Sequence, residues 1–193
     1  MTDNFSQKTI AFKKMGSNVF IDQRAYFKYP ESVEIGSHCA FDNGLHITTK
    51  GRFGSYIHVG PYVSIIGGNN SLLIAGDFST IATGARIICM GEAHLGNGLV
   101  GPTIPKEYKD DMVGGTTVLE RFSNVLTNAV ILPGITVGEG AVIGAGAVLG
   151  SNAEPWSIYL GNPARKVKNR NKEAMIQYAK KLISQKDSLV GQI

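Results

Sequence analysis

Cysteine is scarce in this chain. Only Cys39 and Cys89 occur in 193 residues, and they lie far apart in the sequence. So few thiols exclude a disulfide framework and a cysteine-based metal cluster. No apolar run approaches the roughly 18 residues needed to cross a bilayer, and residues 1–4 lack the basic and apolar regions of a signal peptide. These absences predict a cytoplasmic chain with reduced thiols and no membrane span.

Charged residues are also few, at 18 %, and the excess of positive charge is local. Residues 161–186 hold eight lysines and arginines and the single acid Glu173, a net +7 in a chain whose total is +4, so the rest sums to −3. No motif of interleaved basic and aromatic residues accompanies this segment, so nucleic acid is not an expected partner. The segment is either the solvated face of a helix or an anchor for a small phosphorylated ligand.

Glycine is in excess, with 24 among 193 residues, about 12 % against an average of about 7 %. A second feature is an apolar residue at every sixth position, often followed by glycine. A helical face repeats near 3.6 residues and a strand every two, so a period of six fits short strands separated by turns. Such coils bury their apolar residues by stacking, which predicts an all-β solenoid. The repeating positions are Ile35, Phe41, Ile47, Phe53, Val59 and Ile65, then Ala75, Ile81 and Ile87, then Leu119, Val125, Ile131, Val137, Ile143 and Leu149.

Residues 130–148, VILPGITVGEGAVIGAGAV, contain the most regular hexads, and Gly161-Asn162-Pro163-Ala164-Arg165 follows soon after them. Together these stretches resemble the hexapeptide-repeat, or left-handed β-helix, acyltransferase superfamily, and the resemblance covers residues 30–170. It implies a left-handed parallel β-helix with three hexads per turn, assembly as a homotrimer, and coenzyme-A-dependent acetyl transfer, most often onto sugars.

Three parts are expected along the chain. Residues 1–30 have no clean hexad phase and are predicted to form an N-terminal cap segment, while residues 31–160 form the β-helix with an inserted loop at 90–117. Residues 161–193 comprise the basic segment and an amphipathic C-terminal α-helix. This helix could cap the open end of the solenoid, where strand edges would otherwise be unpaired, or pack on a neighbouring subunit.

The inserted loop is the first candidate for a site, because 32 positions separate Ile87 from Leu119 where six would suffice. His94 stands where this loop leaves the coil, and within the resemblance it matches the family's catalytic histidine. Acetyl transfer needs a base for the proton of the acceptor, and imidazole ionises near working pH. Glu92 could orient this imidazole. We expect direct attack, with a backbone N–H stabilising the oxyanion and no acyl-enzyme at Cys89.

The acyl donor, acetyl-CoA, is placed by the resemblance alone. Thr127 and Ala145 match positions along the groove for the pantetheine arm, where small residues allow close approach. Ser151 matches a position beyond the last coil. Arg165 and Lys168 match basic residues near the nucleotide phosphates, a pairing that would also account for the local positive charge.

Two other functions remain open from the residues. One is a non-catalytic hexapeptide scaffold or binding protein. The other is a metal enzyme like the γ-class carbonic anhydrases, which hold zinc with three histidines. His58 and His94 could supply two ligands, but residues 95–99 contain no third histidine, so no metal is expected. The favoured interpretation is an acetyltransferase for a hydroxyl or amine of a sugar or nucleotide sugar, which by resemblance serves bacterial surface-polysaccharide synthesis.

Overall fold

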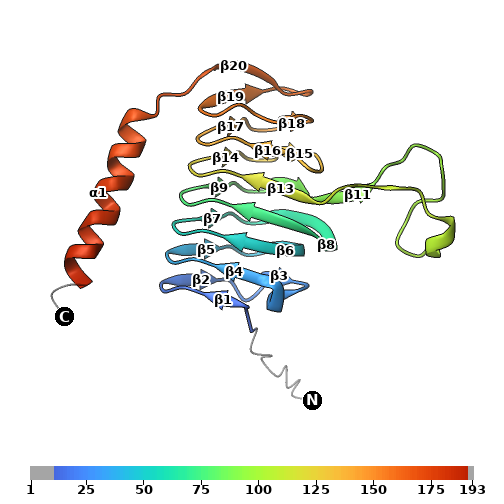
Figure 1. Cartoon of the computed structure of the whole chain (residues 1–193), viewed down its shortest axis with the longest axis horizontal. Helices are drawn as coiled ribbons and strands as arrows, with labels where there is room; N and C mark the ends of the chain where they lie inside the picture. Colours follow the sequence, from blue (N-terminus) through green and yellow to red (C-terminus); the bar gives the residue numbers. More distant parts are fainter. Residues whose placement is uncertain (1–10, 191–193) are drawn as a thin grey trace.

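The computed structural model of the chain describes residues 11–190, with side chains as far as Ser184. The first ten residues of the expected cap segment and the last three of the C-terminal segment lie outside the described residues. The chain winds into a three-sided solenoid of stacked coils (Figure 1), so the predicted all-β solenoid, a left-handed parallel β-helix, is confirmed.

Each coil contributes one short strand to each of three faces. Face 1 holds β2 (Val19–Ile21), β5 (Cys39–Phe41), β7 (His58–Val59), β9 (Thr80–Ile81), β14 (Asn124–Val125), β17 (Val142–Ile143) and β19 (Ser157–Leu160). Face 2 holds β3 (Tyr26–Phe27), β10 (Arg86–Ile88), β15 (Val130–Ile131) and β18 (Val148–Leu149). Face 3 holds β1 (Lys14–Met15), β4 (Val33–Ile35), β13 (Thr116–Leu119) and β16 (Thr136–Val137). The long strands β6 (His46–Phe53) and β8 (Ser64–Ala75) bend around one corner and belong to faces 2 and 3.

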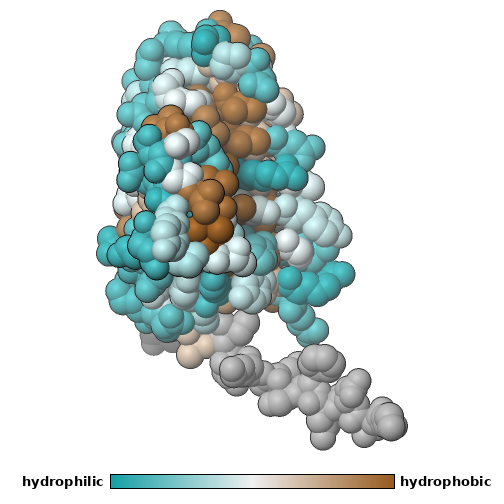
Figure 2. All heavy atoms as spheres, turned by 90° about the vertical axis from the view of Figure 1, so that its right-hand side faces the viewer, coloured by the Kyte–Doolittle hydropathy of each residue, from teal (hydrophilic) through white to brown (hydrophobic). Residues whose placement is uncertain are grey.

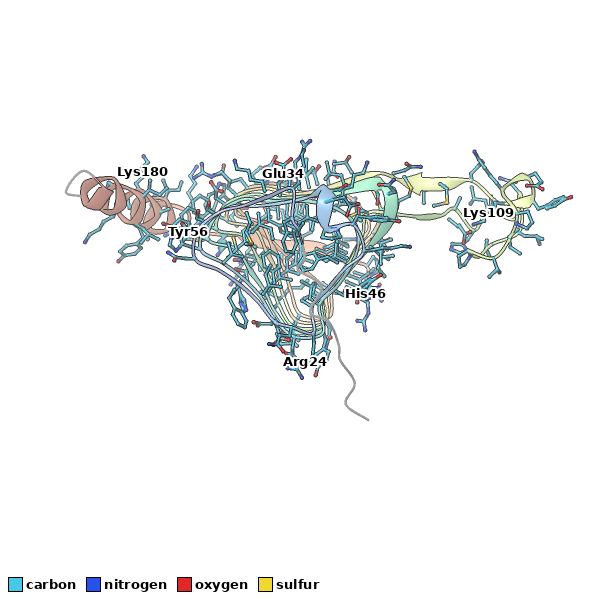
Figure 3. The ribbon with its side chains drawn as sticks, turned by 90° about the horizontal axis from the view of Figure 1, so that it is seen from below. Arg24, Glu34, His46, Tyr56, Lys109 and Lys180 are labelled. Carbon is cyan, nitrogen blue, oxygen red and sulfur yellow. The ribbon has the colours of Figure 1, made fainter. Side chains whose placement is uncertain are left out.

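The three corners are named here by what they carry. The Thr127 corner comprises residues 61–62, 83–84, 127–128 and 145–146, between faces 1 and 2. The loop corner comprises residues 30–32, 67–68, 89–115, 133–134 and 151–152, between faces 2 and 3. The aromatic corner comprises residues 55–56, 77–78, 121–122, 139–140 and 155–156, between faces 3 and 1. Seen along the solenoid axis in Figure 3, these corners form a triangle.

The parallel pairing of the coils places the hexad residues in columns. Val59 pairs with Ile81, which pairs with Val125, which pairs with Ile143, and all four are fully buried. Because every coil presents the same apolar position to the interior, the columns form one continuous core. The predicted role of the six-residue period is therefore confirmed.

The solenoid begins earlier than the expected residue 31. Met15 pairs with Ile35, Ile21 with Phe41, and Phe27 with Ile47, so residues 14–27 already form a coil. The sequence conceals this coil because the short 3-10 helix η1 (Pro30–Ser32) lies at the loop corner. Eight positions, rather than six, separate Phe27 from Ile35, and the shift of two breaks the hexad phase.

The aromatic corner is held by a column of stacked rings. Tyr56 and Phe78 stack with centroids 4.7 Å apart, Phe78 and Phe122 lie 5.2 Å apart, and Trp156 follows at 5.9 Å. All four residues have a positive φ, between 53° and 62°. This left-handed conformation is unfavourable for bulky residues, and ring stacking from coil to coil offsets the cost. In the coil between Phe122 and Trp156 the corner residue is Gly140, and the indole of Trp156 covers it.

Of the two arrangements that the sequence left open for the C-terminal helix, capping of the open end is not the one seen within this chain. Strand β20 (Arg165–Asn169) turns back and pairs antiparallel with β19 at the end of the solenoid. Helix α1 (Glu173–Val190) then runs back along the side of the molecule, beside the aromatic corner (Figures 1 and 3). Arg170 anchors the connection, because its guanidinium donates to the carbonyls of Phe122 and Gly140 at 3.1 and 3.0 Å. Within the described residues, no helix has the length and apolar character that a membrane crossing requires.

The aromatic column generates a stability prediction. Gly140 and Gly146 both have a φ of 67°, but a Cβ at position 140 would overlap the Trp156 indole, whereas a Cβ at position 146 meets open space. Gly146→Ala should therefore lower the free energy of unfolding by about 1 kcal/mol, from backbone strain alone. Gly140→Ala should lower it by about 3 kcal/mol, because the clash adds to the strain. Urea denaturation of both variants measures the difference, and equal losses would contradict the packing role of Trp156.

Candidate functional site

The inserted loop leaves the solenoid as a β-hairpin. Strands β11 (Met90–Glu92) and β12 (Met112–Gly114) pair antiparallel, with Gly91 opposite Val113. The N–H of Gly115 donates to the carbonyl of Cys89 at 2.8 Å and closes the base of the hairpin. The inserted loop expected at residues 90–117 therefore begins with a hairpin that the sequence does not reveal, because strands of three residues are too short to show periodicity. The rest of the loop, with the 3-10 helix η2 (Lys106–Tyr108), projects from the loop corner (Figure 1).

His94 lies two residues after the end of β11, where the two sides of the hairpin begin to separate. Its side chain is exposed and its φ is 55°. A left-handed conformation at a non-glycine residue costs free energy and persists only where neighbouring contacts impose it. In the described part of the chain, the ring makes no hydrogen bond. The exposed ring is therefore available for contact with a substrate.

The structure gives Glu92 partners other than His94. Both carboxylate oxygens of Glu92 accept the N–H of Gly101, at 2.8 and 2.9 Å, and Lys109 lies 3.6 Å away. No hydrogen bond joins Glu92 to His94 within the described residues. The carboxylate instead ties the outer part of the loop to its stem, so the arrangement expected from the sequence is not formed in this chain.

A second carboxylate of the loop, Asp110, carries more contacts than sequence reasoning assigned to it. It is only 4 % exposed, and it accepts the N–H of Asp111 at 2.8 Å, of Leu95 at 2.9 Å and of Gly96 at 3.2 Å. The N–H of Asp111, and then those of Gly96 and Leu95, lower the pKa of Asp110 against the opposing effect of burial, and nearby His94 adds to the lowering. Because the folded-state pKa is depressed, this carboxylate stabilises the loop at neutral pH and loses that effect on acidification. No sequence pattern links Asp110 to His94, since only the folded hairpin brings them together.

The expected donor residues Thr127 and Ala145 lie one above the other on the Thr127 corner. The N–H of Gly146 donates to the carbonyl of Thr127 at 2.9 Å, which joins the two coils. Thr127 and Ala145 are exposed, and within the described chain their own backbone N–H groups have no hydrogen-bond partner. The corner thus presents unpaired donors on successive coils, as an extended amide-containing ligand requires.

The basic residues expected near the donor lie just beyond this corner. Arg165 and Lys168 are exposed on β20, which starts directly after the turn at residues 161–164. Lys166 is paired with Glu154 at 2.7 Å, whereas Arg165 and Lys168 join no ion pair among the described residues. Ser151 is exposed on the loop corner, one hexad after Ala145.

The expected site residues therefore fall into two groups within one chain. His94 and Ser151 belong to the loop corner, while Thr127, Ala145 and the start of β20 belong to the Thr127 corner. The width of face 2 separates the two corners, roughly 20 Å for six extended residues. The two groups therefore do not form one compact site within a single chain.

Nucleophilic and metal chemistry find no support in the remaining side chains. Cys89 is fully buried, and burial raises the pKa of its thiol to about 11, which makes it unsuitable as a thiolate nucleophile. His58 is engaged with Asp42 at 2.8 Å. Among the side chains that the structure describes, no group of three or more His, Cys, Asp or Glu is placed to hold a metal ion.

Comparison with known proteins gives matches over most of the chain. Residues 116–151 match the family model described as "Bacterial transferase hexapeptide (six repeats)". The chain is 28 % identical over 177 residues to the dTDP-4-amino-4,6-dideoxy-D-glucose acyltransferase of Escherichia coli, and the match covers 90 % of each protein. It is also 34 % identical over 125 residues to a probable macrolide acetyltransferase of Lysinibacillus sphaericus, covering 57 % of this chain and 67 % of that protein.

Solved structures extend this likeness to three dimensions. A variant of AntD, an N-acyltransferase from Bacillus cereus, in complex with dTDP-4-amino-4,6-dideoxyglucose and coenzyme A, superposes with a TM-score of 0.86. It is 30 % identical in sequence, and the match covers 92 % of this chain and 94 % of that one. AntD with dTDP and 3-hydroxybutyryl-CoA gives a TM-score of 0.87 at 29 % identity, covering 93 % and 94 % of the two chains. With the repeat, the solenoid and this near full-length likeness in agreement, the protein belongs to the hexapeptide-repeat acyltransferases of the left-handed β-helix fold.

Proposed function

We propose that this enzyme transfers an acyl group from acyl-CoA to the amino group of a dTDP-linked amino sugar. The observation that carries the proposal is the likeness, over about nine-tenths of both chains, to two acyltransferases described with that acceptor. From the sequence we expect a hydroxyl or an amine of a sugar or nucleotide sugar as the acceptor. The likeness to these two enzymes favours an amine. The donor is acetyl-CoA or a longer acyl-CoA, because AntD was crystallised with 3-hydroxybutyryl-CoA. The product is a modified nucleotide sugar, suited to surface-polysaccharide assembly.

His94 acts as the general base in this proposal. The amine nitrogen attacks the thioester carbonyl, forming the C–N bond, and the C–S bond then breaks to release the thiol of coenzyme A. His94 takes the proton that the nitrogen loses and returns one to the departing sulfur. The exposed ring at the root of the projecting loop, with no hydrogen-bond partner among the described residues, supports this role.

The donor lies along the Thr127 corner in this proposal. The unpaired N–H groups of Thr127 and Ala145 can bind the amide carbonyls of the pantetheine arm. Arg165 and Lys168, which join no ion pair within the described residues, can face the nucleotide phosphates. Ser151 lies on the opposite corner, and in this arrangement it contacts the donor held by a neighbouring chain.

A homotrimer would complete the site, as the family resemblance implies. One chain holds His94 and the Thr127 corner on opposite edges of face 2, so the loop of one subunit must meet the Thr127 corner of another. Figure 2 shows hydrophobic residues gathered on the side of the molecule that carries the loop. Face 2 carries exposed apolar side chains, among them Ile66, 43 % exposed, and Leu132, 36 % exposed. Burial of such residues supplies the main driving force for association.

The first prediction concerns the base. His94→Asn should lower kcat about 100-fold or more and leave KM for acyl-CoA near the wild-type value. Thiol release is measured with dTDP-4-amino-4,6-dideoxyglucose and either acetyl-CoA or 3-hydroxybutyryl-CoA. His58→Asn, a change at the Asp42-paired histidine of face 1, is the matched control and should retain activity. Wild-type kcat in His94→Asn would remove the proposed base, and no turnover with any nucleotide amino sugar would favour the scaffold function.

The second prediction concerns the donor phosphates. Arg165→Ala should raise KM for acetyl-CoA about three- to five-fold, because an exposed charge pair contributes up to about 1 kcal/mol. The same variant should behave as wild type with acetyl-pantetheine, which lacks the nucleotide. Lys166→Ala is the control, since Lys166 is already paired with Glu154. An equal rise in KM for both donors would argue against a phosphate contact.

The third prediction concerns assembly. Light scattering during gel filtration should give the mass of three chains for the wild type. Leu132→Asp places a charge on the apolar surface of face 2 and should yield smaller species with little activity. Leu160→Asp alters an exposed leucine of β19 on face 1 and should leave the trimer intact. A monomeric wild type with full activity would contradict the shared site.

A further inference from the structure

The carboxylate of Asp110 is the most heavily hydrogen-bonded side chain of the inserted loop. A buried carboxylate is costly unless its oxygens are satisfied. Oδ1 accepts the N–H of Asp111, and Oδ2 accepts those of Leu95 and Gly96. Charge-assisted bonds of this kind are among the strongest available to a loop. Asp110 therefore joins the two sides of the loop, just beyond the paired strands of the hairpin.

This junction lies immediately after His94. Leu95 and Gly96 are the next two residues, so their N–H groups belong to the peptides that set the direction of the chain after His94. His94 has a φ of 55°, a conformation that needs support from its surroundings. A further backbone bond on the preceding side, from the N–H of Ala93 to the carbonyl of Asp111 at 2.7 Å, holds the same turn. Without the carboxylate, the segment after His94 would lose its hydrogen bonds, whereas the segment before His94 would keep the bond from Ala93 to Asp111.

Charge distribution in the loop also favours Asp110 as the partner of His94. Glu92 is paired with Lys109 at 3.6 Å and accepts the N–H of Gly101. Asp111 is exposed to solvent, which screens its charge. Asp110 is buried, makes no ion pair with a lysine or arginine in the described residues, and interacts electrostatically with His94.

We propose that Asp110 is the positioning residue for the catalytic base: its carboxylate binds the N–H groups of Leu95 and Gly96 and holds His94 in its left-handed conformation. This inference rests on the proposed role of His94 in acyl transfer. Asp110 touches no reacting atom and acts through His94 alone.

Three variants test the proposal in the full-length protein. Asp110→Asn keeps the shape and one acceptor oxygen but loses the charge. Asp110→Ala removes all three hydrogen bonds. Asp111→Asn makes the same chemical change as the first variant at the exposed neighbour, and is the matched control. Thermal unfolding and circular dichroism check that the solenoid is intact, and Asp110→Asn stays informative where Asp110→Ala loosens the loop.

Two readouts are expected to change in Asp110→Asn and to remain unchanged in Asp111→Asn. The rate constant kcat should fall about ten-fold with KM for acyl-CoA unchanged, because the base is displaced while the donor corner is untouched. The NMR cross-peaks of the His94 ring, recorded on 15N-histidine protein and assigned with His94→Asn, should change position because the ring is held differently. Asp110→Ala should lower kcat further.

The outcomes separate this inference from the proposed function. If His94→Asn retains activity, the proposed base is lost, and the ring cross-peaks of His94 still report whether Asp110 positions the ring. If Asp110→Asn and Asp111→Asn are alike in both readouts, the positioning role is overturned. A fall in kcat with the ring cross-peaks of His94 unmoved would reduce Asp110 to a structural residue and would equally overturn the proposal.

Discussion

Parallel hydrogen bonding between successive coils is the interaction on which the rest of this molecule depends. Each coil satisfies the backbone groups of its neighbours and covers their apolar residues, so no coil is stable alone. This pairing keeps Val59, Ile81, Val125 and Ile143 in one buried column. It also restricts where the chain can change length, because an insertion within a face would break the register of every strand beside it.

Insertions are therefore confined to corners, and the proposed catalytic base lies on one of these insertions. The hairpin with His94 leaves at the loop corner, and two additional residues around η1 leave at the same corner. Once outside the solenoid, the loop has no coil to define its conformation. Hydrogen bonds to two carboxylates fix the loop instead. Glu92 accepts the N–H of Gly101, and Asp110 accepts N–H groups from the turn after His94. The loop combines a rigid attachment with a tip stabilised by polar contacts, which suits a reactive side chain held away from the core.

The sequence predicts the regular part of the fold because each hexad has the same surroundings. It does not predict the places where the fold departs from this regularity. The first coil was missed because two extra residues shift its phase, and the direction of α1 depends on Arg170 reaching the carbonyls of Phe122 and Gly140. Glu92 looked like the partner of His94 because it is near in sequence. In the fold its carboxylate turns to Gly101 and Lys109, and Asp110 takes the place beside His94 from the far side of the hairpin.

By itself the sequence determined the solenoid, the corner from which the loop departs, the histidine at its root and the family to which these features belong. Each of these features depends on the spacing of residues that are close in the sequence, because strand and turn preferences act over a few residues. Only the tertiary structure decided which carboxylate adjoins His94, where the first coil starts, and how far the loop lies from the Thr127 corner. Those relations arise from contacts between segments distant in the chain, whose pairing depends on geometry rather than on period.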